Sequence, residues 1–130
     1  MEFTIEPGII LKLEKIVQPA DSAIIYGSGA VDVFSTPAMI AFMERTAYES
    51  VQGLLPEGYT TVGTEVNIKH LRATLVGKQV KCQSLLIDVD GRKLIFEVTS
   101  SDDKGEIGTG KHTRFIIEKR HFIEKLEQSF

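Results

Sequence analysis

The stretch TPAMIAFMERTAYESVQG, residues 36–53, has the clearest helical pattern in this chain. Thr36 is a preferred N-cap residue, and Pro37 suits the first helical position because its missing N–H would have no partner inside a helix. Gly53 is a common residue at a helix end. We therefore expect one helix over about residues 37–52.

The expected helix is amphipathic. At about 100° per residue, one broad face gathers Met39, Ile40, Phe42, Met43, Thr46, Ala47, Ser50 and Val51. Glu44 lies at the border of that face. A carboxylate there is either a solvated surface group or a partly desolvated one, whose pKa rises unless a partner holds it charged. The helix alone favours the solvated surface residue.

The remaining sequence predicts strands joined by short turns. Asp90-Gly91 is a strong hairpin signal because glycine tolerates positive φ. Residues 118–130 place apolar side chains at helical spacing, which predicts an amphipathic C-terminal helix docked on the body. The expected strands cover residues 10–17, 23–26, 59–71, 79–89, 92–100 and 108–117.

The strand over residues 59–71 holds a second titratable side chain. Period-two alternation places Val62, Thr64, Val66, Ile68 and His70 on one face, so His70 ends an apolar face. An imidazole titrates near neutrality and carries protons well. An isolated strand histidine is nevertheless more often a hydrogen-bonded structural residue.

Several short motifs are too incomplete to indicate a binding site. Gly27-Ser28-Gly29 and Gly108-Thr109-Gly110 lack the further residues of a phosphate-binding loop. Residues 88–91 lack the rest of a calcium-binding loop. Cys82 lies in a strand pattern and is expected to be a buried small hydrophobe and no nucleophile.

Length and composition set the class of protein. A chain of 130 residues fits one domain, residues 1–130, with a core that needs no metal. A single cysteine rules out an intrachain disulfide and, with an acidic N-terminus, favours the cytoplasm. No apolar run approaches the roughly 20 residues that span a membrane. A net charge of −3 without a basic run argues against nucleic acid, which leaves a small organic ligand.

These elements combine into an α+β architecture. One helix covers only one face of a curled sheet, so an antiparallel sheet wrapped around one central helix satisfies the pattern, with a short helix at the C-terminus. Uncovered strand edges and the free helix flank favour a homodimer, or a dimer of dimers. This arrangement is the hotdog fold.

The residues also resemble a known family. Thr36, Glu44 and the segment 63–70, followed by EIGTGKHTR at 106–114, are similar to the fluoroacetyl-CoA thioesterase group of hotdog acyl-CoA hydrolases. The resemblance covers nearly the whole chain, and the family's threonine, glutamate and histidine match Thr36, Glu44 and His70 in order. It implies hydrolysis of a short acyl-CoA, with coenzyme A as part of the substrate and no further cofactor or metal.

The resemblance also implies a role for each residue. Glu44 acts as general base or as nucleophile, and His70 orients it or transfers protons. Thr36 hydrogen-bonds the substrate or the glutamate. The helix N-terminus and an N–H near Gly63 stabilise the oxyanion. Arg114 contacts the coenzyme A phosphates or gates the pocket, unless it is only a solvated strand charge.

Two departures limit what the resemblance implies. The stretch between Gln18 and Thr36 is several residues shorter than in the fluoroacetyl enzyme, where an aromatic lid covers the acyl group, so fluoroacetyl selectivity is not expected to carry over. Pro37 lacks an amide hydrogen where the family has one. A non-catalytic protein that binds acyl-CoA or a small apolar acid is the main alternative. A hydratase has less support because no paired Asp and His lie at the strand–helix turn.

Overall fold

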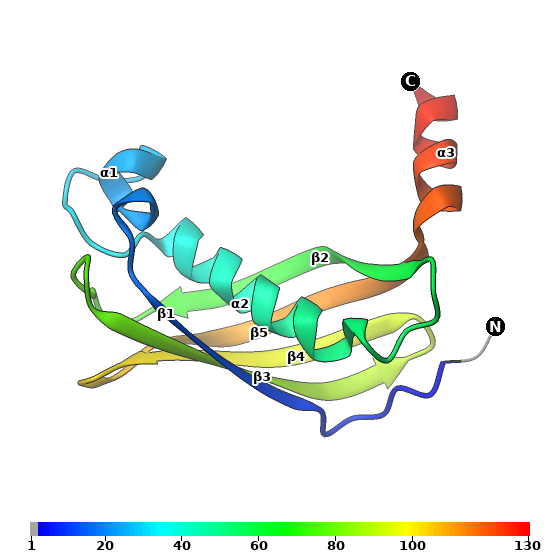
Figure 1. Ribbon diagram of the computed structural model, residues 1–130, viewed down its shortest axis with the longest axis horizontal. Helices are drawn as coiled ribbons and strands as arrows, with labels where there is room; N and C mark the ends of the chain where they lie inside the picture. Colours follow the sequence, from blue (N-terminus) through cyan, green and yellow to red (C-terminus); the bar gives the residue numbers. More distant parts are fainter. Residues whose placement is uncertain (1–2) are drawn as a thin grey trace.

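The computed structural model describes residues 3–130 as one curved antiparallel sheet with a long helix across it (Figure 1). Met1 and Glu2, which begin the acidic N-terminus considered above, lie outside the described residues. The strand order is β1-β3-β4-β5-β2, so β1 and β2 form the two edges. The strands are β1 (Ile10–Ile16), β2 (Tyr59–His70), β3 (Gln79–Asp90), β4 (Lys93–Asp102) and β5 (Gly105–Glu118).

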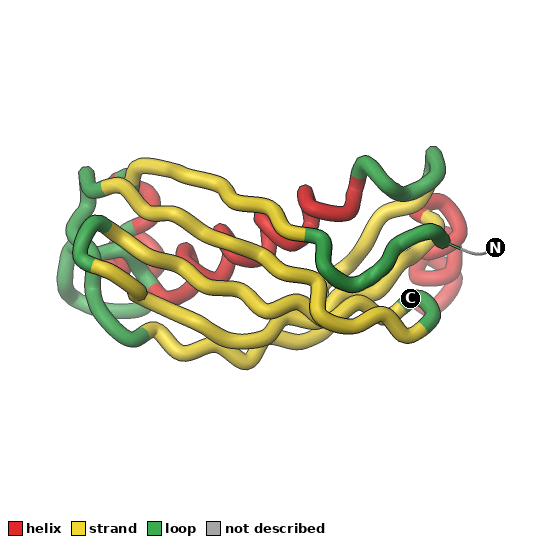
Figure 2. The backbone as a smooth tube through the Cα atoms, turned by 90° about the horizontal axis from the view of Figure 1, so that it is seen from below, coloured by secondary structure: helices red, strands yellow, loops and turns green. Residues whose placement is uncertain are grey.

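Helix α2 (Thr36–Gln52) covers one face of this sheet, and no helix among residues 3–130 lies over the other face (Figures 1 and 2). Met39 and Met43 on the helix are fully buried against strand residues such as Phe96. This burial removes a large apolar area from water and is the main stabilising term of the fold. The remaining core residues of the helix and strands are Ala38, Phe42, Ala47, Val51, Val80, Cys82, Leu86, Leu94, Val98, Ile107 and Ile116. The expected α+β sheet around one helix is therefore confirmed.

The beginning of α2 differs from the prediction by one residue. Ser35, and not Thr36, is the N-cap: its Oγ accepts a hydrogen bond from the Ala38 N–H at 3.1 Å. Thr36 and Pro37 lie in the first helical turn. The sequence offers two adjacent hydroxyl residues, and the cap at Ser35 leaves the Thr36 hydroxyl free to bond elsewhere. Gly53 ends the helix as predicted.

Residues 23–26 form a short helix, α1 (Ala23–Tyr26), and not the expected strand. Ser22 caps this helix because its Oγ accepts a hydrogen bond from the Ile24 N–H at 3.2 Å. Gly27 ends it with a φ of 70°, a left-handed conformation that suits glycine. A 3-10 turn, η1 (Pro19–Asp21), precedes it. These local caps outweigh the strand propensity of the isoleucines.

A β-bulge divides β2, so the predicted single face is wrong. Gly63 pairs with Arg114 and Glu65 pairs with Thr113, which leaves Thr64 as an extra residue. An extra residue shifts the alternation of the strand. Val62 therefore lies on the face opposite to that of Ile68 and His70. The same shift turns Gly63 toward α2.

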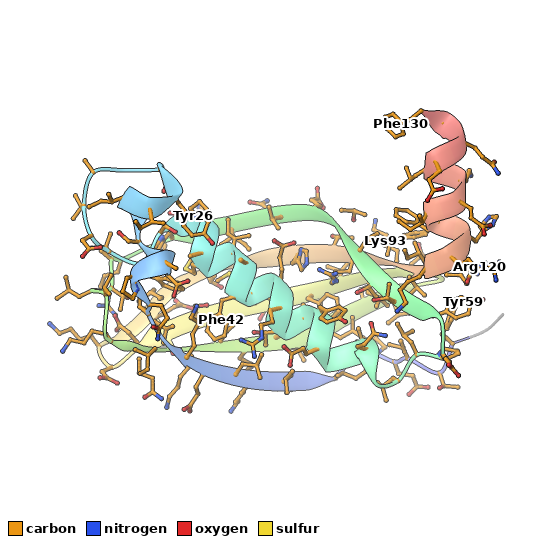
Figure 3. All side chains as sticks on the ribbon, turned by 45° about the horizontal axis from the view of Figure 1, so that its top comes forward. Tyr26, Phe42, Tyr59, Lys93, Arg120 and Phe130 are labelled. Atoms are coloured by element: carbon orange, nitrogen blue, oxygen red, sulfur yellow. The ribbon has the colours of Figure 1, made fainter. Side chains whose placement is uncertain are left out.

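The C-terminal helix is present but does not dock on the body. Helix α3 (Lys119–Ser129) projects away from the sheet, with Phe130 at its tip (Figures 1 and 3). Ile123 and Leu126 are about half exposed, and no residue of α3 is buried. These two apolar side chains are therefore largely uncovered among residues 3–130. No helix in this part of the chain is long and apolar enough to cross a membrane.

The close contact between β5 and β2 predicts a strong effect of one methyl group. A Cβ on Gly110 would overlap the Asn67 carbonyl oxygen, and backbone cannot move aside as a flexible side chain does. We expect Gly110→Ala to lower the free energy of unfolding by about 1–3 kcal/mol, measured by urea denaturation. Gly53→Ala is the matched control because nothing lies near its Cβ position and its φ is −68°. Equal stability of the two variants would contradict the prediction.

Candidate functional site

Thr36 and His70 meet where the start of α2 faces the end of β2. Thr36 Oγ1 lies 2.8 Å from His70 Nδ1, which is hydrogen-bonding distance. Both residues line a pocket of about 310 Å³. The structure therefore brings two of the three predicted catalytic residues into contact. The pocket is completed by Ala23, Ser28, Val33, Phe34, Ser35, Leu71, Arg72 and Ala73.

The state of His70 suits proton transfer. Burial lowers the pKa of His70 below its usual value, and an interaction with the Arg72 backbone only partly opposes this. The ring is therefore neutral at pH 7 and able to accept a proton. Its Nε2 atom is shielded from solvent and has no hydrogen-bond partner among residues 3–130.

The pocket wall next to His70 is fixed by an ion pair. Arg72 Nη2 contacts Asp102 Oδ1 at 2.5 Å, and Thr74 Oγ1 donates to Asp102 Oδ2 at 2.8 Å. Burial disfavours the charged Asp102, but hydrogen bonds from Arg72, the Lys104 N–H and Thr74 outweigh it and lower its pKa to about 2. Asp102 is therefore charged at neutral pH. The pair ties the end of β2 to the turn between β4 and β5.

Glu44 does not reach Thr36 and His70 within one chain. Eight residues along the helix axis separate it from Thr36 by about 12 Å. Its side chain is 41% exposed and lines a different hollow, together with Ala41, Arg45, Tyr48, Glu49 and Arg114. The predicted site residues thus form two clusters in the chain: Thr36 with His70, and Glu44 with Arg114.

Arg114 is buried and not a solvated strand charge. Its Nε donates to Thr61 Oγ1 at 2.7 Å and its Nη2 to the Thr61 carbonyl oxygen at 2.9 Å. The guanidinium also lies 5.7 Å from the centre of the Tyr48 ring, within cation–π range. Burial lowers the pKa of Arg114, while the negative charge of Glu44 and the Tyr48 phenol oppose this. Arg114 is therefore a fixed positive charge beside Glu44.

His112 belongs to the same cluster and was missed as a site residue in the sequence. It is fully buried, and its Nδ1 lies 2.8 Å from the Glu65 carbonyl oxygen. Its Nε2 lies 3.1 Å from Arg114 Nη1 and 4.0 Å from Glu44 Oε2. The usable signal was the spacing of His112 and Arg114, which puts both on one face of β5.

Gly63 is the point at which this cluster closes. A Cβ built on Gly63 would lie 3.0 Å from Glu44 Oε2, 3.1 Å from His112 Cε1 and 3.4 Å from Arg114 Nη1. Only glycine leaves room for all three side chains without displacement. The β2 bulge turns this position toward α2, so bulge and glycine act together.

Residues 23–33 border the pocket of Thr36 and His70. They belong to the shortened stretch in which the sequence predicts that the aromatic lid is absent. Ala23, Ser28 and Val33 line the pocket, while Ile24 and Ile25 of α1 are more than half exposed. Small side chains therefore stand at this wall. Within residues 3–130, no group of three or more His, Cys, Asp or Glu residues is placed to hold a metal ion.

Residues 17–120 match the family model for fluoroacetyl-CoA-specific thioesterase. This chain belongs to that family. A fluoroacetyl-CoA thioesterase from Streptantibioticus cattleyicolor is 33% identical over 97 residues, which cover 75% of this chain and 70% of the relative. The resemblance seen in the sequence is thereby confirmed, and with it a kinship to acyl-CoA thioesterases.

Solved structures agree with this assignment. A structure of the fluoroacetyl-CoA thioesterase aligns with a TM-score of 0.89 at 27% identity, covering 97% of this chain and 98% of the other. A hot-dog-like protein from Thermanaerovibrio acidaminovorans aligns with a TM-score of 0.88 at 22% identity, covering 95% and 92%. The expected hotdog fold is confirmed.

The two buried histidines predict a stability that depends on pH. Burial lowers the pKa of both His70 and His112 below 6.5, so the unfolded chain binds more protons than the folded one in acid. Stability therefore rises with pH in this range and falls as the pH drops from 7 to 5. Urea denaturation at pH 5, 6 and 7 measures this. The double variant His70→Gln/His112→Gln should flatten the profile, and a wild-type profile as flat as that of the variant would contradict it.

Proposed function

We propose that this protein hydrolyses a short acyl-CoA thioester to the free acid and coenzyme A. The observation that carries the proposal is the contact between Thr36 Oγ1 and His70 Nδ1 at 2.8 Å, in a chain of the thioesterase family. The relative from Streptantibioticus cattleyicolor is a fluoroacetyl-CoA thioesterase, and Thr36, Glu44 and His70 supply a hydroxyl, a base and a proton carrier, which thioester hydrolysis can use. Coenzyme A enters as part of the substrate, and the reaction calls for no further cofactor.

The chemistry assigns a role to each group. The Glu44 carboxylate either takes a proton from the attacking water or attacks the carbonyl carbon itself to give an anhydride that water then opens. In both routes the C–S bond breaks, and the thiolate leaves and takes a proton. Neutral His70 accepts and returns protons, while the Thr36 hydroxyl donates to the carbonyl oxygen as negative charge develops there.

A second copy of the chain would bring the two clusters together. Strand β2 lies at a sheet edge, and its residues 63–67 are exposed. Antiparallel pairing of two β2 strands, centred near Val66, would place His70 of one copy within about two residues of Gly63 of the other. Glu44 of one copy would then face Thr36 and His70 of the second. We therefore propose a homodimer as the active unit, and a dimer of dimers as a possible higher assembly.

The acyl group is proposed to be small and not specifically fluorinated. The residues of α1 and the following loop that line the Thr36 pocket, Ala23 and Ser28, are small, and the aromatic residue of the lining, Phe34, is fully buried. At the helix N-terminus Pro37 has no amide hydrogen, and the Ala38 N–H is occupied by Ser35. Oxyanion donors must then come from the Thr36 hydroxyl or from an N–H near Gly63, and Arg114 supplies positive charge beside Glu44.

The setting of the reaction follows the same proposal. Residues 1–130 would form one domain, because a single sheet and a single core contain both clusters. A buried free cysteine, Cys82, is compatible with the reducing cytoplasm as its location. The partner is a small acyl-CoA, with neither nucleic acid nor membrane involved.

Hydrolysis can be tested with a panel of acyl-CoAs that includes acetyl-CoA, fluoroacetyl-CoA and longer saturated chains. The free thiol of the released coenzyme A is measured by absorbance with a thiol reagent. Removing a general base or proton carrier typically costs 10²–10⁴-fold, so we expect Glu44→Gln and His70→Ala to lower kcat by at least about 100-fold. Glu97→Gln is the matched control, because this exposed carboxylate on β4 lies outside both clusters.

Two outcomes would contradict this function. No thiol release from any acyl-CoA by the wild type would exclude hydrolysis, and intact bound acyl-CoA after long incubation would then support the non-catalytic binding protein. Full activity of both variants would remove Glu44 and His70 from the mechanism. Absorbance at the enoyl band measures hydration of an enoyl-CoA, and its occurrence would favour a hydratase.

The proposed homodimer predicts a measurable mass and a sensitive surface. Light scattering after gel filtration should give at least twice the 14.4 kDa of one chain. Leu126 on α3 is exposed in the chain, and we expect a copy to cover it, so Leu126→Glu should weaken the assembly. Lys125→Glu changes the charge at the neighbouring, also exposed position and is the control. A monomeric wild type that is fully active would contradict the dimer as active unit.

A further inference from the structure

His112 is buried at the centre of the Glu44 cluster, and no role in the proposed reaction has been given to it. The ring touches neighbours from three elements: Glu65 on β2, Arg114 on its own strand and Glu44 on α2. It also stacks on Phe96 of β4, with ring centres 6.4 Å apart. A polar ring buried this deeply is costly unless each nitrogen has a partner. Both nitrogens of His112 have one.

The two hydrogen bonds define the protonation of this ring. A carbonyl oxygen only accepts, so Nδ1 carries the proton and donates it to Glu65. A guanidinium only donates, so Nε2 must be unprotonated to accept from Arg114 Nη1. Burial is the largest influence and lowers the pKa of His112; the Glu65 hydrogen bond opposes it, the charge of Arg114 lowers the pKa further, and the charge of Glu44 raises it. The ring is therefore neutral and holds one tautomer.

The acceptor at Nε2 completes the restraint on Arg114. Thr61 holds Nε and Nη2 of the guanidinium, and His112 is the group that holds Nη1. Gly63 leaves no spare space beside these atoms, since a single added carbon would contact all three side chains. The Glu44 side chain is 41% exposed and accepts no hydrogen bond from another side chain among residues 3–130. The electrostatic attraction to the positive charge of Arg114 is therefore what stabilises the position of this carboxylate.

We propose that His112 is a positioning residue: its unprotonated Nε2 orients Arg114 so that the guanidinium charge stays beside the Glu44 carboxylate. This inference rests on the proposed thioester hydrolysis. His112 transfers no proton itself, because its Nε2 lone pair is engaged by Arg114 and its Nδ1 proton by a backbone carbonyl. The role is to keep the carboxylate in the geometry and field that the reaction needs.

Two amide substitutions separate this role from packing. In His112→Gln the side-chain oxygen can reach the Nε2 position and still accept from Arg114, whereas in His112→Asn the shorter amide reaches only the Nδ1 position and keeps the bond to Glu65. Both remove the ring that stacks on Phe96. Misplacement of a reacting group by about 1 Å costs on the order of 100-fold. We therefore expect His112→Asn to lower kcat by about 10- to 100-fold with little change in KM. We expect the kcat of His112→Gln to stay within about threefold of the wild type.

The result that overturns the proposal is an equal loss in both variants, which would indicate packing, or wild-type kcat in His112→Asn. Thermal unfolding of both variants checks that each one folds. The pH profile of kcat supplies a second readout: since His112 is neutral and does not titrate in the reaction, His112→Gln should leave both limbs of the profile unchanged. A displaced limb would make His112 a proton carrier and contradict the assignment.

Nitrogen NMR tests the hydrogen bonds without any activity. We expect the wild-type ring of His112 to show a protonated Nδ1 and a bare Nε2 at neutral pH, and the Arg114 Nη1–H signals to persist in His112→Gln and broaden in His112→Asn. An imidazolium or the Nε2–H tautomer would overturn the proposal. If the wild type hydrolyses no thioester, the proposed function fails, and these spectra still decide whether His112 orients Arg114.

Discussion

The close approach of α2 to strands β5 and β2 is the constraint on which the rest of this structure depends. A Cβ at Gly108 would lie within 2.6 Å of the side chain of Met39, and one at Gly63 would press against Glu44. Glycine at these two positions lets the helix lie directly on the strands. Because interiors are packed like crystals, this contact fixes the height and rotation of the helix. It also decides which helix residues face the sheet.

The β2 bulge determines which strand residues face α2. Without the extra residue Thr64, strand alternation would keep one face along the whole of β2, and Gly63 and His70 could not both lie on the helix side. With it, the glycine stands under Glu44 while His70 reaches Thr36 at the other end of the strand. Bulges commonly redirect side chains next to functional sites. The two clusters therefore share one strand and one helix.

Much of the fold could be predicted from the sequence because it depends on patterns among neighbouring residues. The helix with Pro37 and Gly53 at its ends, the Asp90-Gly91 hairpin and the alternating strands each follow from a few neighbouring residues. What failed depends on competition or on distance. Ser35 is the N-cap of α2 in place of the expected Thr36. Ser22 and Gly27 cap a short helix at the two isoleucines where a strand was expected. Whether α3 docks on the sheet depends on tertiary packing, which no short sequence pattern describes.

The sequence named candidate site residues, which stay a prediction, and it did not describe their geometry. The sequence pointed to Thr36, Glu44 and His70 through order and spacing, and the structure places only the first and last of these in contact. A distance of eight residues along a rigid helix cannot be closed by side-chain rotation, since it amounts to about 12 Å. Either Glu44 acts on a substrate long enough to touch both clusters, or a second chain closes the gap. A thioester carbonyl is a single reacting centre, and the base and oxyanion donors must both lie about 3 Å from it. This requirement favours the proposed homodimer, in which the proposed restraint of Arg114 by His112 would keep positive charge beside Glu44 in each copy.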